Sequence, residues 1–366
     1  DKYINVGIGL RTSFQADGRN GDSWSKDFSA ENVRLYTNGQ VLPGLSFEVN
    51  FDYTEGSNHA PGALQPGDVS LLDGVAKFEV NEYLNIWGGQ FLPPSDRANL
   101  SGPYYLNTWA FPFVQKYPAV YAGRDRGAAV WGQLQGGKFK YQLGVFDGTQ
   151  NNNSKDSPLV AGRLVANLLD PEPGYYNAST YYGAKDILAL GFAFQQQNAG
   201  ANPNSLAVNA DGNDFFGWNL DLLFEKRLGD EGSDGTFTLD AAFYHYDLDG
   251  AFYIPDTSLN DGYGYTIFVG YLLPFEVGYG KFQGKLQPHF QWQAFHYDGN
   301  SVVALPVGGA LAVVANPRDR QRIDVGVHYV MDAFNARATL VYFNERPSDS
   351  SLNNTNGVTL AMQIQF

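Results

Sequence analysis

Residues 281–296 read KFQGKLQPHFQWQAFH, and polar and apolar side chains alternate along this stretch with a period of two. A period of two is typical of a β-strand, because successive side chains of a strand point to opposite faces of a sheet. One face of this strand would carry Phe282, Leu286, Phe290, Trp292 and Ala294. The opposite face would carry Lys281, Gln283, Lys285, Gln287, His289, Gln291 and Gln293. The stretch therefore predicts a strand with one apolar face and one long polar face.

The same alternation recurs along the chain. In the last segment, apolar residues occupy every second position from Val358 to Phe366, with Thr359, Ala361, Gln363 and Gln365 between them. Strands of about ten residues with one apolar face and aromatic ends are typical of the wall of an outer-membrane barrel. We expect sixteen strands, at residues 1–14, 28–41, 45–54, 69–80, 83–91, 125–135, 138–147, 159–169, 186–195, 214–226, 236–247, 261–273, 280–296, 320–331, 335–346 and 356–366.

Short and long connections alternate between these strands. Short turns are expected at 42–44, 81–82, 136–137, 227–235, 274–279 and 332–334. Long polar loops are expected at 15–27, 55–68, 92–124, 148–158, 196–213, 248–260, 297–319 and 347–355. Segment 170–185 stands in a short-turn position but is longer than a normal turn. The pattern predicts one all-β domain over 1–366, a closed sixteen-stranded antiparallel transmembrane β-barrel with short periplasmic turns and long external loops.

Composition excludes several other classes of protein. The 366 residues include no Cys, which excludes disulfide scaffolds and thiol chemistry. No run of about 18 apolar residues exists that could form a spanning helix. The formal charge of −14, from 24 basic and 38 acidic residues, argues against a nucleic-acid partner. The chain begins at Asp1 without a basic, apolar leader, as expected of an exported protein whose signal peptide has been removed.

Two short motifs add a family resemblance. Residues 86–94 read IWGGQFLPP, and residues 121–132 read YAGRDRGAAVWG after an insertion. This layout resembles the phosphate-selective porin O/P family, in which a Gly-x-Phe-x-Pro element enters a long loop that leaves through an Arg-containing, Gly-rich strand start. Terminal Phe366 also resembles the final aromatic residue of outer-membrane barrels. The chain lacks the dense Arg/Lys clusters of a phosphate-selective pore.

The resemblance implies a sixteen-stranded, usually trimeric channel whose third long loop narrows the lumen. Loop 92–124 would then be the constriction loop, with pore-lining cations Arg97, Lys116, Arg124 and Arg126. An alternative role for these cations is to bond loop carbonyls and hold the loop against the wall. The loop aromatics could form a sugar-sliding track, although packing against the wall is favoured by the large area each would bury: Tyr104, Tyr105, Trp109, Phe111 and Phe113.

Alternation also assigns charged side chains to the lumen. The expected inward cations are Arg34, Lys77, Lys138, Lys140, Arg163, Lys281, Lys285, Arg322 and Arg337. The expected inward anions are Glu48, Asp52, Glu79, Asp221, Glu225, Asp240, Asp324 and Glu345. Opposed walls of charge would create a transverse field that favours polar solutes. The alternative is that these groups are ordinary solvated side chains paired with their neighbours.

Catalysis and tight metal binding are not expected. The sequence has no Gly-x-Ser-x-Gly and no His-Glu-x-x-His motif. No cofactor is expected, except that two acidic loop tips could hold Ca²⁺: Asn209, Asp211, Asn213 and Asp214, and Asp247, Asp249 and Gly250. Such tips could instead be solvated, or could bridge lipopolysaccharide through divalent ions.

These observations predict a porin in the outer membrane of a Gram-negative bacterium. It would be a homotrimer surrounded by lipid and lipopolysaccharide, passing small hydrophilic solutes and ions by passive diffusion with an anion preference. The alternatives are a cation-preferring porin, the barrel sheath of a porin–cytochrome electron conduit, and a soluble all-β binding protein.

Overall fold

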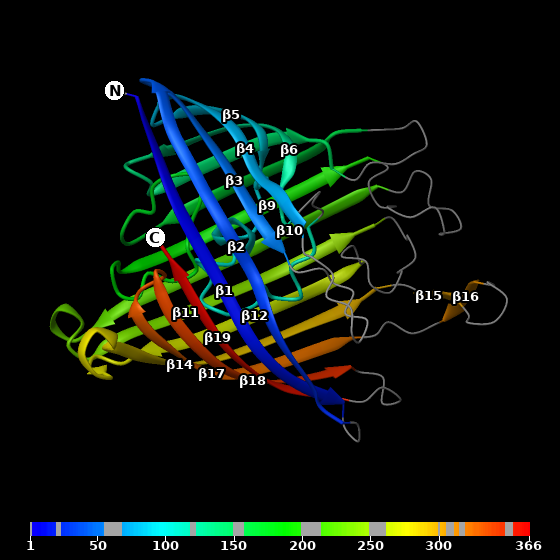
Figure 1. The fold of residues 1–366 in the computed structure, drawn as a ribbon. Coiled ribbons are helices and arrows are strands. Elements are labelled where there is room, and N and C mark those ends of the chain that lie inside the picture. Colours follow the sequence, from blue (N-terminus) through cyan, green and yellow to red (C-terminus); the bar gives the residue numbers. More distant parts are fainter. Residues whose placement is uncertain are drawn as a thin grey trace.

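The computed structural model describes residues 2–19, 23–54, 68–117, 122–148, 157–198, 214–248, 261–298, 301–304, 311–314, 319–347 and 354–366. Within these residues, sixteen long antiparallel strands form a closed barrel, with both termini at the same end (Figure 1). The strands are β1 (Tyr3–Arg19), β2 (Ser25–Leu42), β3 (Leu45–Thr54), β4 (Asp68–Asn81), β5 (Leu84–Phe91), β6 (Asp125–Leu134), β7 (Phe139–Phe146), β8 (Leu159–Asn167), β9 (Ile187–Gln197), β10 (Phe215–Leu228), β11 (Gly235–Asp247), β12 (Gly262–Leu272), β14 (Gly284–Tyr297), β17 (Arg320–Asp332), β18 (Ala336–Pro347) and β19 (Thr355–Gln365).

Closure of the barrel comes from pairing of the first and last strands. β1 pairs with β19 in antiparallel register, for example Phe14 with Leu360, and β1 also pairs with β2. Each strand thus has a neighbour on both sides, so no edge is left with unpaired backbone groups.

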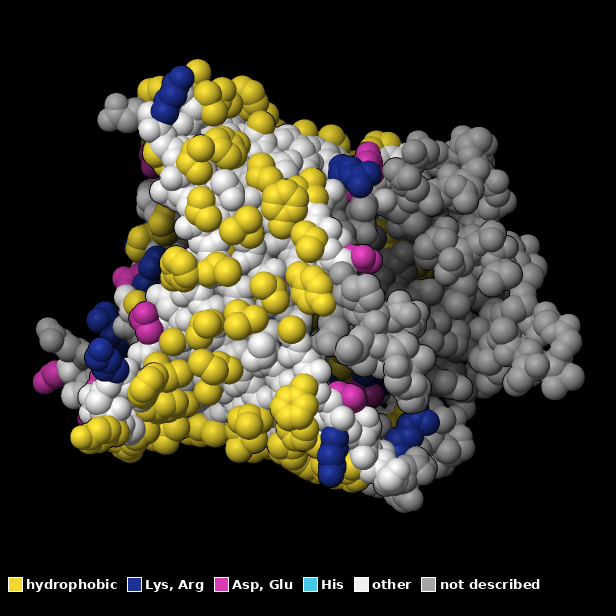
Figure 2. Space-filling model, in the orientation of Figure 1, with side chains coloured by type: hydrophobic (Ala, Val, Ile, Leu, Met, Phe, Trp, Pro, Cys, Tyr) yellow, Lys and Arg dark blue, Asp and Glu magenta, His cyan; other side chains and the backbone are white. Residues whose placement is uncertain are grey.

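The barrel is apolar outside and polar inside. Figure 2 shows apolar side chains spread over the outer wall, with charged side chains near its two rims. Leu164, Leu220 and Leu360 are more than half exposed on the outer face. Arg163, Gln287 and Gln363 are buried on the inner face. This arrangement is the reverse of a soluble protein and fits a wall surrounded by lipid.

The predicted fold class and all sixteen predicted strands are confirmed, with differences at the strand ends. β1 and β2 continue beyond the predicted strands, through pairs such as Gln15 with Asp27, into the expected loop 15–27. The apolar alternation stops where side chains leave the lipid, but backbone pairing does not need apolar side chains.

Small elements were not predicted from the sequence. They are the two-residue strand β13 (Glu276–Val277), the separate hairpin β15 (Ser301–Ala304) and β16 (Leu311–Val314), helix α1 (Arg97–Ser101), and the 3₁₀ turns η1 (Asp230–Gly232) and η2 (Gly280–Phe282). Among the described residues, no helix combines the length and the apolar character needed to cross a membrane.

Replacing Leu360 by Arg tests the lipid-facing wall. Leu360 lies at the centre of β19 and is 54% exposed on the outer face. We expect Leu360→Arg to lower the free energy of unfolding by about 2–4 kcal/mol, because a charge is moved to the bilayer midplane. Urea unfolding of the protein in lipid vesicles measures this loss.

Leu134→Arg is the matched control. Leu134 is similarly exposed, at 46%, but is the last residue of β6, where a charge reaches water. Its expected cost is about 0–1 kcal/mol. Equal costs at the two positions would contradict a membrane-spanning wall.

Candidate pore constriction

The third long loop leaves β5 and folds into the barrel, as predicted. Pro93 and Pro94 end the strand, because proline has no N–H to continue the ladder. Asp96 then caps α1 by accepting a hydrogen bond from the Asn99 N–H at 3.3 Å. Residues 92–104 are buried inside the barrel.

Side chains of the wall hold the loop by its backbone carbonyls. Arg163 Nη1 donates to Ser95 O at 2.9 Å, and Arg337 Nη1 donates to Leu106 O at 2.8 Å. Further donors come from other strands: Gln195 to Pro94 O, His328 Nε2 to Asn107 O, and Gln363 to Tyr104 O. These bonds come from strands on several sides of the lumen, so the loop has a defined position.

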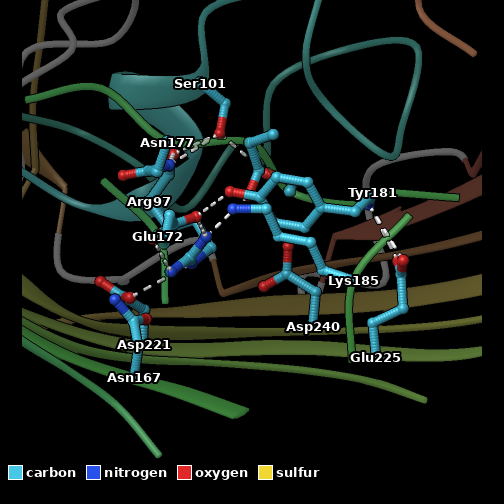
Figure 3. Close-up of polar contacts among 12 residues, drawn as sticks. Arg97, Ser101, Asn167, Glu172, Asn177, Tyr181, Lys185, Asp221, Glu225 and Asp240 are labelled. Atoms are coloured by element: carbon cyan, nitrogen blue, oxygen red, sulfur yellow. Dashed lines mark hydrogen bonds and ion pairs between the residues drawn. The ribbon is translucent and has the colours of Figure 1, made fainter. Parts of the chain in front are cut away.

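A second segment folds into the barrel from the opposite end. Residues 168–186 connect β8 to β9, and Ser179 N–H donates to Tyr105 O at 3.0 Å. Arg97 binds Glu172 through two parallel bonds, Nη1 to Oε1 at 2.8 Å and Nη2 to Oε2 at 3.0 Å. Figure 3 shows these two side chains facing each other. The two segments therefore meet inside the lumen and are bonded to each other.

Buried charges around this contact compensate each other. Burial alone would raise the pKa of Glu172, but Arg97 and then Lys140 outweigh it and lower the pKa to about 2. On the wall next to this contact, Arg163 of β8 binds Asp221 of β10 through two bonds of 2.6 and 2.8 Å. The predicted cations Arg97, Lys140 and Arg163 thus all lie in one buried anchor. Arg97 holds the loop in place there, as its alternative role has it, and Lys140 and Arg163 are paired with neighbouring carboxylates.

Open space remains between the loop and the β1–β4 side of the barrel. Two of the cavities lined by described residues have volumes of about 560 and 500 Å³, and Arg34 and Pro103 line both. The larger cavity reaches Phe334 in the turn between β17 and β18, at the end that carries the termini. The smaller cavity reaches Glu31, nearer the long loops. The gap between Arg34 and Pro103 is therefore the candidate constriction.

Ion pairs line this gap. Arg34 Nε bonds Asp52 at 2.8 Å, Arg124 Nε bonds Asp73 at 3.0 Å, and Lys77 binds Glu48. At the smaller cavity, Arg11 lies 3.7 Å from Glu31. The predicted residues Arg34, Arg124, Glu48 and Asp52 are thus brought together on one side of the lumen.

Other predicted cations lie elsewhere. Arg126 is exposed at the start of β6 and donates to Gln90. Lys281 is exposed in η2, because β14 begins at Gly284 and not at residue 280. Lys138 lies in the turn before β7, and Lys285 is half-buried in β14. Neither lines the two cavities.

The remaining predicted site residues have separate settings. Glu79 is exposed near the end of β4. Arg322 lines a third cavity of about 150 Å³ and binds Asp324 at 2.8 Å. Lys116 Nζ lies 5.0 Å from the Phe295 ring, and burial, followed by nearby Arg320, lowers its pKa to about 8.

Several residues of the constriction were not predicted. Arg11 and Asp73 lie on inward positions of predicted strands, so alternation alone could have found them. Tyr104 packs where Gly9 leaves room, since a Cβ at Gly9 would come within 2.7 Å of its ring. Glu172 had only an indirect signal, the unusual length of segment 170–185.

Among the described residues, no three His, Asp or Glu side chains come together in a way that could hold a metal ion. Of the expected Ca²⁺ tips, Asn209, Asp211, Asn213, Asp249 and Gly250 lie outside the described residues.

Replacing Glu172 by Gln tests the anchor. The substitution leaves Arg97 and Lys140 buried without their carboxylate, so we expect the free energy of unfolding at pH 7 to fall by about 3–5 kcal/mol. Because the pKa of Glu172 is lowered to about 2, its stabilisation is present above its ordinary value of 4.5 and is lost as the pH falls through about 2. Urea unfolding in lipid vesicles at pH 7 and at pH 2 measures both effects.

Glu345→Gln is the matched control for this substitution. Glu345 pairs with Arg320 near the surface, where the side chains are 21% and 39% exposed. Its loss should be about 1 kcal/mol or less. An equally small effect of Glu172→Gln would show that the anchor does not stabilise the barrel.

Comparison with known proteins supports the fold. No protein-family model and no curated protein sequence matches the chain. Among solved structures, OprB of Pseudomonas putida is 13% identical, with a TM-score of 0.63 over 99% of this chain and 94% of OprB. An anion-selective porin from Comamonas acidovorans is 12% identical, with a TM-score of 0.59 over all of both chains.

A further similar structure is the trimer form of OmpT, an outer membrane protein of Vibrio cholerae. It is 12% identical, with a TM-score of 0.57 over 100% of this chain and 99% of OmpT. The finer resemblance to the phosphate-selective O/P family remains a prediction from residues 86–132. At these identities the likeness is one of fold, and the chain shares the closed barrel of outer-membrane porins.

Proposed function

We propose that this protein is a porin that passes small hydrophilic solutes and ions by passive diffusion. It lies in the outer membrane of a Gram-negative bacterium. The observation that carries the proposal is the pair of adjoining cavities, about 560 and 500 Å³, inside a closed barrel with an apolar exterior. Charged side chains such as Arg34, Glu48 and Asp73 are part of their lining, which suits solutes that keep part of their water.

The electron-conduit alternative is disfavoured by the interior of the barrel. A sheath has to leave its lumen open for a folded cytochrome. Here the loop residues 92–117 and the segment 168–186 fill much of the lumen and are fastened to each other through Arg97 and Glu172. The remaining space suits small solutes.

Charge at the constriction supports weak ion selectivity. Among the described residues that line the two cavities, Arg11, Arg34 and Arg124 stand against Glu31, Glu48 and Asp73, so three positive charges face three negative ones. The similar Comamonas porin is described as anion-selective, and an anion preference is what the family resemblance implies. The balanced charge favours at most a small anion preference here.

Assembly and surroundings follow the same proposal. The apolar outer wall contacts lipid, and the long loops face lipopolysaccharide. A homotrimer is proposed because the family resemblance implies one and a similar structure is described as a trimer form. Binding of Ca²⁺ at the loop tips remains a prediction from the sequence.

The zero-current potential of the purified protein in a planar bilayer, across a KCl gradient, tests this proposal. We expect a conducting pore whose K⁺ and Cl⁻ permeabilities agree within about threefold, because the charges balance. Arg34→Gln should shift the potential toward K⁺, and Glu48→Gln should shift it toward Cl⁻, since each removes one charge at the cavities.

Arg126→Gln is the control, because Arg126 is exposed at a strand end and lines neither cavity. It should leave the potential unchanged. Strong selectivity in the unmodified protein would contradict the balanced-charge argument, and no conductance from folded protein would contradict the porin itself.

A further inference from the structure

Aromatic rings from separate parts of the chain surround the 560 Å³ cavity. They are Tyr36 of β2, Tyr104 and Tyr105 of the constriction loop, Tyr176 and Tyr181 of segment 168–186, and Phe334 of the β17–β18 turn. This volume falls within the range of about 300–1,000 Å³ typical of sites that enclose small organic molecules. A pathway for simple ions alone has no need of such a wall.

Some of these rings are buried against the wall, and others remain exposed. Tyr104 is 1% exposed and packs against the wall beside Gly9. Tyr105 is 44% exposed, and its ring meets the half-buried Phe334 edge-on with centroids 5.0 Å apart. Tyr105 and Phe334 therefore form an aromatic surface that remains accessible at the mouth of the cavity.

The charged groups of this cavity already have partners. Arg34 is bonded to Asp52, Arg124 to Asp73, and Glu48 to Lys77. A charged solute would have to displace one of these partners and leave it uncompensated. A neutral solute rich in hydroxyl groups can instead bond to the unused lone pairs and donors of intact ion pairs.

The aromatic rings and the paired charges of the cavity favour the same class of solute. Aromatic rings favour a solute with a flat apolar face, and the intact ion pairs favour one that is neutral and hydroxylated. A pyranose sugar has both properties, because its C–H groups gather on the faces of the ring while its hydroxyls project around the edge. An acyclic polyol has the hydroxyls without the rigid apolar face.

We propose that the 560 Å³ cavity is a binding site for neutral pyranose sugars, with Tyr105 and Phe334 as its stacking surface. This inference rests on the proposed porin function and names the class of solute that the pore favours. Sugars pass in preference to anions of similar size because the cavity offers ring surface and paired charge.

Swelling of liposomes that contain the purified protein compares three solutes of similar size: glucose, sorbitol and gluconate. Glucose should enter about threefold faster than sorbitol, which lacks the ring, and faster than gluconate, which carries a charge. Equal rates for glucose and sorbitol would overturn the stacking argument. Fastest entry of gluconate would overturn the preference for neutral solutes.

Maltose block of the KCl current in a planar bilayer tests the residues. The current should fall in a saturable manner as maltose is added. The double variant Tyr105→Ala, Phe334→Ala should raise the half-blocking concentration about tenfold, because two ring contacts are removed. Tyr279→Ala, at a 92% exposed tyrosine outside the cavity, should leave it unchanged.

The outcomes separate the two proposals. A folded protein that conducts KCl but is not blocked by maltose would overturn the sugar site and leave the porin standing. A folded protein that conducts nothing would overturn the porin itself.

Discussion

The wall of this barrel must pair its backbone N–H and C=O groups within itself, because lipid offers them no partner. β1 and β19 complete that pairing along a register that runs from Gly9 with Gln365 to Arg19 with Thr355. A ring of sixteen strands encloses a wider space than wall side chains can fill. Closure of the barrel therefore leaves an interior space that other segments of the chain occupy.

Loop residues 92–117 and segment 168–186 occupy that space, and their contact depends on paired charges. Each brings ionised groups away from bulk water, which is stabilising only when every charge has a close partner. The bonds from Arg97 to Glu172 and from Arg163 to Asp221 satisfy this condition on one side of the lumen. The opening is left on the other side, where the ion pairs of β1–β4 stay next to the cavities. The buried anchor and the open cavities thus lie on different sides of the same lumen.

Most of what could be predicted from the sequence follows from the alternation of polar and apolar side chains along single strands. It suffices for the number and order of the strands, and it places Arg34 and Asp52 on the same inner face. It cannot say which inward charge meets the loop, because the path of the loop across the lumen brings Arg97 to Asp221, which Arg163 also binds. Strand 280–296 was predicted a few residues too long, since Lys281 and Gln283 keep the alternation while the backbone turns through η2.

The bonds that hold the constriction loop join distant parts of the chain. Gln363 and Arg337 hold the carbonyls of Tyr104 and Leu106, more than 200 residues earlier in the sequence. These two bonds exist only when β18 and β19 are in place, because those strands carry the donors. The position of the loop at Tyr104 and Leu106 therefore depends on the C-terminal strands. The size of the aperture consequently depends on the C-terminal strands as well as on the loop itself, and a barrel without them would lack two of the bonds that set its size limit.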